Sequence, residues 1–183
     1  IVNVLISVGM DVRWDAELSL EDMINEGVRQ GYTHPENVLR GSVLTDPDGL
    51  RVNTKDNTPA VIHTKIVSGD TVEIEVAAKG GGSEAKAKFA MLNPSDSVVD
   101  WILSVIPSMG AGWCPPGILG VGIGGTPEKA MLLAKESLME PLNMHELKAN
   151  GPKDHLQGLR LELFEKVNAL GIGAQGLGGL TTV

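Results

Sequence analysis

The residue with the most distinctive chemistry in this 183-residue chain is Cys114, its only cysteine. Pro115 and Pro116 follow it and stiffen the backbone after the thiol. A thiol in such a setting can serve as a metal ligand, a nucleophile or a small buried hydrophobic side chain. Cysteine followed by proline also occurs where thiolates hold iron–sulfur clusters. Because one thiolate cannot hold a cluster, that interpretation places the remaining ligands outside this chain.

Three glycine-rich loops, at residues 80–82, 120–125 and 171–179, form a second group of candidates. Such loops can present several backbone N–H groups to an anion. None of them matches a P-loop or a complete Gly-x-Gly-x-x-Gly dinucleotide fingerprint. The alternative is that the glycines serve turns and close packing.

Arg40 is the third candidate, because it lies in a long polar segment over residues 32–59, where a guanidinium could form a forked contact with a carboxylate. Long irregular segments of this kind are often functional. The alternative is an ordinary surface charge.

Metal-ligand spacing is absent among the histidines, which are His34, His63, His145 and His155. The chain also lacks the nucleophile-elbow pattern of the serine hydrolases.

Composition narrows the function classes. The net charge of −8 argues against a nucleic-acid surface and against binding to an anionic membrane. No apolar run approaches the roughly 20 residues that span a bilayer. The single cysteine favours a reducing compartment, the cytoplasm. The chain opens on Ile1, inside an apparent strand, so we expect it to be an internal fragment of a longer protein.

The elements that position these residues follow from hydrophobic periodicity. We expect a mixed α/β fold in one domain over residues 1–183, with helices packed on a mixed sheet that includes an antiparallel hairpin at about 60–78. Strands are predicted at 1–8, 60–67, 71–78 and 118–123. Helices are predicted at about 20–31, 96–106, 127–139 and 154–170.

Seven stretches taken together resemble the iron–sulfur (class I) fumarate hydratases and their tartrate dehydratase relatives. They occur in the family's order and cover essentially the whole chain. They are VGMDV (8–12), VLRGS (38–42), NTKDNTPA (53–60), KGGGSE (79–84), CPP (114–116), GIGGT (122–126) and LGIGAQG (170–176). One departure is Ala85, where relatives commonly have asparagine.

The resemblance implies a hydro-lyase of the tricarboxylic acid cycle that reversibly hydrates fumarate to (S)-malate on a [4Fe-4S] cluster. Cys114 matches the middle of three cysteine ligands. The others are expected in a Cys-Gln-Asp-Thr-Gly motif before Ile1 and beyond Val183. By the same resemblance Arg40 and Gly82 contact the dicarboxylate substrate, and Lys86 lines the site. The catalytic residues are expected outside this chain, in a C-terminal domain or a beta subunit.

The resemblance also implies a homodimer for the intact cytoplasmic enzyme, with this chain inactive alone. Two alternatives stay open. One is a tartrate dehydratase of the same family. The other is a non-catalytic module that binds an anion or nucleotide through the glycine loops, for which nucleotide and not iron would raise the melting temperature.

Overall fold

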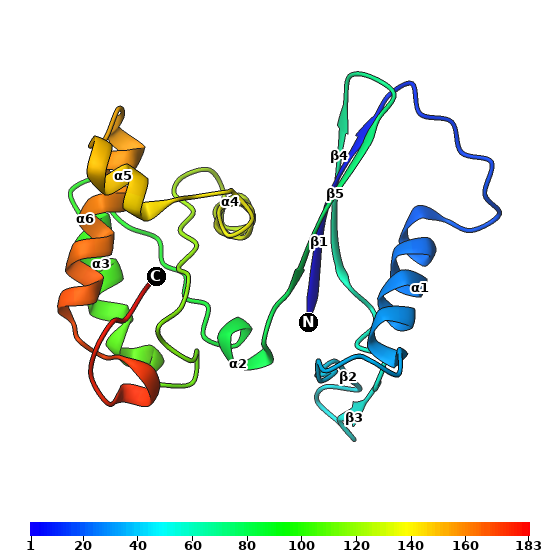
Figure 1. Cartoon of the computed structure of the whole chain (residues 1–183), viewed down its shortest axis with the longest axis horizontal. Coiled ribbons are helices and arrows are strands. Elements are labelled where there is room, and N and C mark those ends of the chain that lie inside the picture. Colours follow the sequence, from blue (N-terminus) through cyan, green and yellow to red (C-terminus); the bar gives the residue numbers. More distant parts are fainter. The chain divides into compact units, whose positions relative to one another are not determined.

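The computed structural model describes residues 1–183, which form two compact units (Figure 1). The N-terminal unit comprises residues 1–84 and the C-terminal unit residues 85–183. Each is described by itself below. Helices and a mixed sheet are both present, so the predicted mixed α/β class is confirmed. None of the helices is long and apolar enough to cross a membrane.

The N-terminal unit contains all five strands of the chain and two helices. In chain order these are β1 (Val2–Gly9), α1 (Leu20–Thr33), β2 (Leu44–Thr45), β3 (Val52–Asn53), β4 (Val61–Val67), β5 (Val72–Ala78) and α2 (Gly81–Glu84). The sheet order is β4-β1-β5, with β1 parallel to β4 and antiparallel to β5. The short strands β2 and β3 pair separately.

The predicted hairpin at 60–78 needs a correction in its pairing. Both strands form at the expected places, but β1 lies between them and takes the hydrogen bonds of each. The connecting loop reaches over the end of β1, where Asp11 N–H donates to Gly69 O at 2.9 Å. A Cβ on Gly9 would lie 2.2 Å from that same oxygen, so the loop can cross only a glycine. Alternation within two local strands does not reveal that a third strand separates them.

The core of the N-terminal unit lies between β1 and α1. The even-numbered side chains of β1 are at most 6% exposed, and one face of α1 covers them. Ser19 caps α1 by accepting a hydrogen bond from Asp22 N–H at 3.1 Å. The packed side chains are Val2, Val4, Ile6 and Val8 from β1, with Leu20, Ile24, Val28 and Tyr32 from α1.

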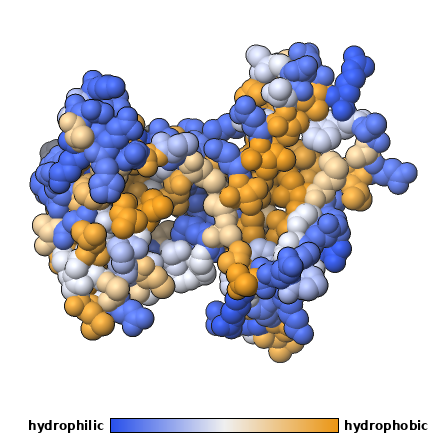
Figure 2. All heavy atoms as spheres, in the orientation of Figure 1, coloured by the Kyte–Doolittle hydropathy of each residue, from blue (hydrophilic) through white to orange (hydrophobic).

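Apolar side chains also gather over this sheet where no helix covers them (Figure 2). Val72, Ile74 and Val76 of β5 pair with β1 residues on the face that α1 contacts. They are nevertheless 37%, 52% and 62% exposed. The helix therefore covers the centre of the sheet more completely than its β5 edge.

The C-terminal unit is helical. It contains α3 (Val98–Val105), α4 (Pro127–Ser137), α5 (Met144–Asn150) and α6 (His155–Ala169), with short 3₁₀ turns at Pro107–Met109 and Ala174–Gly176. Its buried core combines α3, α6 and the indole of Trp113. Three predicted helices are confirmed within a few residues, and Asp154 caps α6 by accepting from Gln157 N–H at 2.8 Å.

The strand predicted at 118–123 does not form. A Cβ on Gly120 would lie 2.2 Å from Ala134 O, and one on Gly122 would lie 1.9 Å from Ala130 O. This segment therefore runs against the backbone of α4. Its apolar alternation reflects packing on a helix, which the pattern alone does not distinguish from pairing in a sheet.

Candidate functional site

The Arg40 segment is held by two asparagines that lie further along the chain. Asn53 Nδ2 donates to Gly41 O at 2.9 Å. Asn57 Oδ1 accepts from Ser42 N–H at 2.8 Å and from Val43 N–H at 3.2 Å. These contacts fix the backbone immediately after Arg40.

The loop that carries Asn57 is itself anchored. Asp56 Oδ1 accepts from the backbone N–H of Thr58 at 3.0 Å and from its hydroxyl at 2.8 Å. These two hydrogen bonds lower the pKa of Asp56. Ala60 N–H donates at 2.8 Å to the side chain of Asn25 on α1. The helix that packs on the sheet thus positions the loop that positions Arg40.

The glycine loop at 80–82 meets the Arg40 segment at Ser42. A Cβ on Gly81 would lie 3.4 Å from Ser42 Oγ, so the two backbones pass close together. The start of β1 joins them, since Lys79 N–H donates to Ile1 O at 2.8 Å. The structure therefore brings together two segments predicted to bind substrate, those of Arg40 and Gly82. Both residues are exposed.

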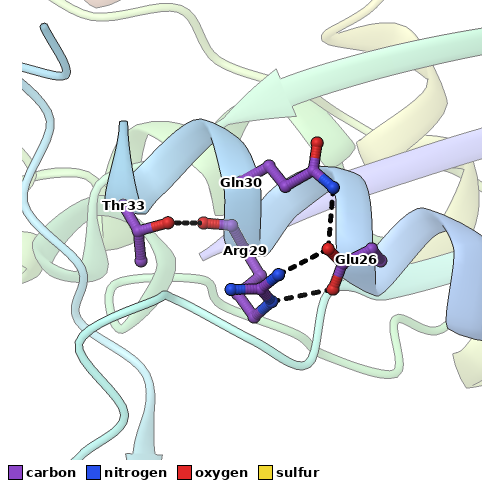
Figure 3. A network of polar contacts seen from close by, with 4 residues as sticks. All are labelled: Glu26, Arg29, Gln30 and Thr33. Atoms are coloured by element: carbon purple, nitrogen blue, oxygen red, sulfur yellow. Dashed lines mark hydrogen bonds and ion pairs between the residues drawn. The ribbon is translucent and has the colours of Figure 1, made fainter. Parts of the chain in front are cut away.

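The cations near this place differ in their pairing. On α1, Arg29 Nε donates to Glu26 at 2.7 Å, and Gln30 donates to the same carboxylate (Figure 3). These contacts lower the pKa of Glu26 to about 2, chiefly through the Arg29 hydrogen bond. Lys79 pairs with Glu84 at 3.4 Å. Arg40 takes part in none of the chain's ion pairs.

A second group of predicted residues meets in the C-terminal unit. Cys114 is exposed and carries a free thiol. Its backbone is left-handed, with φ 61°, and its N–H donates to Ala111 O at 3.0 Å. Lys86 lies over the same loop, because a Cβ on Gly112 would lie 2.9 Å from Lys86 Cε. Left-handed backbone costs an L-residue about 1–2 kcal/mol, and such conformations cluster at functional sites.

The Cys114 loop is closed by its neighbours on both sides. Trp113 is 6% exposed, and a Cβ on Gly117 would lie 2.8 Å from its indole ring. Gly117 then forms a bridge with Thr182, whose hydroxyl donates to Gly117 O at 2.8 Å. Packing below and hydrogen bonding beside the loop leave the thiol facing outward.

Asn168 of α6 supports that bridge. Its Oδ1 accepts from Thr181 N–H at 2.8 Å and from Thr182 N–H at 3.0 Å. Sequence reasoning missed Asn57 and Asn168. Both partners lie 13 to 15 residues away along the chain, so no local pattern marks them. Asn57 lies in the stretch NTKDNTPA that carries the family resemblance, which marks the stretch without assigning this role, and Asn168 lies three residues before the glycine-rich stretch 171–179.

The three glycine loops have different roles. The 120–125 loop packs against α4, as described above. In the 171–179 loop a Cβ on Gly173 would lie 1.9 Å from Gly178 O, so that loop folds tightly on itself. Loop 80–82 alone adjoins a predicted binding residue. The close-packing interpretation therefore accounts for two of the loops.

Within the chain, no group of three or more histidine, cysteine, aspartate or glutamate side chains could hold a metal ion. Cys114 is the one thiol, and its exposure suits a ligand that completes its set with residues from elsewhere. Its site role, like those of Arg40, Gly82 and Lys86, stays a prediction.

Comparison with known proteins adds a family. Residues 1–183 match the family described as "Fumarate hydratase (Fumerase)". A protein of Methanocaldococcus jannaschii named "Putative L(+)-tartrate dehydratase subunit alpha" is 34% identical over 96% of this chain and 61% of its own length. The L(+)-tartrate dehydratase subunit alpha of Escherichia coli K12 is 34% identical over 72% of this chain and 43% of its own length. The chain thus spans less than two thirds of these relatives.

Proposed function

We propose that this chain, which belongs to the iron–sulfur (class I) fumarate hydratase family, is the part of a dicarboxylate hydro-lyase that supplies one carboxylate-binding group and one cluster ligand. The observation that carries the proposal is the junction of the Arg40 segment with the glycine loop at Ser42. There the backbone two residues after the unpaired Arg40 lies against a glycine loop, whose own backbone a small ligand can approach closely.

Arg40 is suited to bind a substrate carboxylate. Its planar guanidinium can donate two parallel hydrogen bonds to the two oxygens, and no acid of this chain competes for it. Gly82 is exposed and lacks a side chain, so substrate can reach its backbone N–H. Holding the carboxylate at both places would orient the carbon that gains or loses the hydroxyl group.

Cys114 fits the role of one cluster ligand. It is exposed, reduced in this structure and fixed in a closed loop. A bound [4Fe-4S] cluster would supply an iron that acts as a Lewis acid on the substrate hydroxyl. The other two thiolates would come from residues outside this chain. Thr182 and Val183 pair with Gly117, so a ligand shortly after Val183 would start close to the Cys114 loop.

Lys86 completes the proposed group in the C-terminal unit. Its aliphatic stem covers Gly112, and its Nζ lies 3.6 Å from the position that a Cβ on Gly112 would occupy. The ammonium thus stands near the cysteine loop, where it would attract a negatively charged ligand.

Two substrates follow from the family and the relatives. Fumarate, hydrated to (S)-malate, follows from the family description. L(+)-tartrate follows from the names of the two relatives. Those names include an alpha subunit, so we propose that a beta subunit supplies the catalytic residues that this chain lacks. We also propose that the intact enzyme is a cytoplasmic homodimer. A single domain over residues 1–183, internal to the catalytic region of the longer protein, is part of the same proposal.

The test is an anaerobic assay of the full-length protein, with its beta subunit if that is a separate chain, on fumarate, (S)-malate and L(+)-tartrate. We expect turnover of at least one, with iron present. Turnover of fumarate alone would identify a fumarate hydratase, and turnover of tartrate alone a tartrate dehydratase. No turnover of any of the three by iron-loaded protein would contradict the proposal.

A further inference from the structure

Asn57 occupies a position whose backbone and burial both disfavour an ordinary side chain. Its φ is 61°, in the left-handed region, and its exposure is 0%. Its Nδ2 has no hydrogen-bond partner in the chain. A glycine there would adopt the same backbone without burying an unpartnered amide nitrogen. What glycine lacks is the Oδ1 acceptor.

Asn57 Oδ1 accepts hydrogen bonds where the Arg40 segment meets the glycine loop at 80–82. Asn57 Oδ1 holds Ser42 N–H and Val43 N–H from 15 and 14 residues away. Ser42 is two residues after Arg40, and its side chain lies against Gly81. A shift of the Ser42 backbone would therefore move the guanidinium relative to the glycine loop.

The surrounding contacts leave this role to Asn57. Asn53 Nδ2 donates to Gly41 O at 2.9 Å and Thr54 N–H donates to Val43 O at 3.0 Å, but Asn57 is the side chain that accepts from the N–H groups of Ser42 and Val43. The loop of Asn57 is fixed to α1 through Ala60 and Asn25, so its own position is determined by the core of the unit. The side chain is fully buried and is thus not itself exposed to a ligand.

We propose that Asn57 is a positioning residue that sets the spacing between Arg40 and Gly82 and thereby the affinity for the substrate carboxylate. The inference rests on the proposed function. It makes Asn57 a determinant of substrate binding and leaves cluster retention to other residues.

The test compares Asn57→Gly with wild type in the full-length, iron-loaded protein. Glycine keeps the left-handed backbone and removes the amide side chain, including the Oδ1 acceptor. We expect KM to rise roughly tenfold, as for a lost binding interaction, while kcat changes less than about threefold and iron content stays constant. Asn57→Asp restores an acceptor for both N–H groups and should return KM to within about threefold of wild type.

A matched control is Asp46→Gly. Asp46 is also left-handed, with φ 50°, and accepts a backbone N–H, that of Leu50, at 2.7 Å in the same long segment. It is exposed, and its hydrogen bonds stay within residues 46–51. Its substitution should leave KM unchanged. An equal rise of KM in Asp46→Gly and Asn57→Gly, or no rise in Asn57→Gly, would overturn the inference.

Two further outcomes are decisive. If Asn57→Gly does not fold, as judged by circular dichroism, Asn57→Asp carries the test, and a KM raised tenfold or more despite the retained acceptor overturns the inference. If wild type turns over none of the three dicarboxylates, the proposed function fails, and calorimetry with succinate decides. Weaker succinate binding in Asn57→Gly than in Asp46→Gly then supports the positioning role, whereas equal binding, or none by wild type, overturns it.

Discussion

The two units use the same device to hold different segments. In the N-terminal unit the Oδ1 of Asn57 accepts two consecutive backbone N–H groups, and in the C-terminal unit that of Asn168 does the same. Both amides leave a buried Nδ2 without a partner. The shared geometry shows that a buried amide can fix a loop whose own sequence has no regular hydrogen-bonding pattern.

The difference lies in what each amide supports. Asn57 holds Ser42 and Val43, two and three residues after Arg40, an exposed cation suited to bind an anion. Asn168 acts indirectly on the Cys114 loop. It accepts a hydrogen bond from Thr182 N–H, and the Thr182 hydroxyl donates to Gly117 O beside that loop. We therefore expect damage to the first to weaken substrate binding, and damage to the second to weaken retention of iron.

The largest effect is expected from Cys114→Ser, which removes the chain's only thiolate. A serine hydroxyl is a poor substitute for a thiolate on iron. We expect loss of the cluster and of measurable turnover in the full-length protein, followed by iron content and visible absorption. Ser108→Ala, which removes an exposed hydroxyl of the same unit, is the control. A full cluster in Cys114→Ser would contradict the ligand assignment.

Arg40→Ala tests the proposed substrate binding by the N-terminal unit. Loss of a charge-assisted fork should lower kcat/KM roughly 10- to 100-fold while iron content stays at the wild-type value. Arg13→Ala removes the same charge from another exposed position and should change kcat/KM less than about threefold. Steady-state kinetics on the substrate that wild type turns over provides the measurement. Equal losses in the two variants would reduce Arg40 to an ordinary surface charge.

Asn168→Ala tests the proposed retention of iron by the C-terminal unit. Alanine suits the helix, but it leaves the N–H groups of Thr181 and Thr182 unpaired in a buried place. The free energy of unfolding should fall by about 2–6 kcal/mol, since each of the two groups costs about 1–3 kcal/mol. Iron content after gel filtration should fall too, while KM of the remaining iron-loaded enzyme stays constant. A raised KM with full iron content would contradict the assignment of iron retention to Asn168 and of substrate binding to Asn57.

Gly122→Ala has the smallest expected effect on function. It tests whether the 120–125 loop serves packing against α4. The new methyl group would lie 1.9 Å from Ala130 O, so α4 must shift, and we expect a loss of about 1–3 kcal/mol in the free energy of unfolding. Gly158→Ala on α6 meets no atom within 4 Å and should stabilise by about 0.5–1 kcal/mol. Denaturant titration of both variants measures this. No destabilisation in Gly122→Ala would reopen an anion-binding role for that loop.

Local signals predicted the elements better than their assembly. The caps Ser19 and Asp154 and the periodicity behind them determine α1 and α6 from nearby residues. The insertion of β1 between β4 and β5 depends on residues more than 50 positions apart, which a local pattern does not record. The alternation at 118–123 predicts a strand, but its glycines pack on the surface of α4, and such glycines fit a helix surface as well as a pleat.

The candidate site divides in the same way. Residues with distinctive chemistry, such as Arg40 and Cys114, could be singled out from the sequence and its family resemblance. The amides that hold their loops could not, because Asn57 and Asn168 are distinguished by accepting from two consecutive backbone N–H groups that lie 13 to 15 residues away along the chain.

The most direct measurement sets Asn57→Gly against Asn168→Ala in the full-length protein, with KM and iron content determined for both preparations. We predict a crossed result, in which Asn57→Gly raises KM at constant iron content and Asn168→Ala lowers iron content at constant KM. Two variants that change both quantities in parallel would contradict the separation of substrate binding from cluster retention.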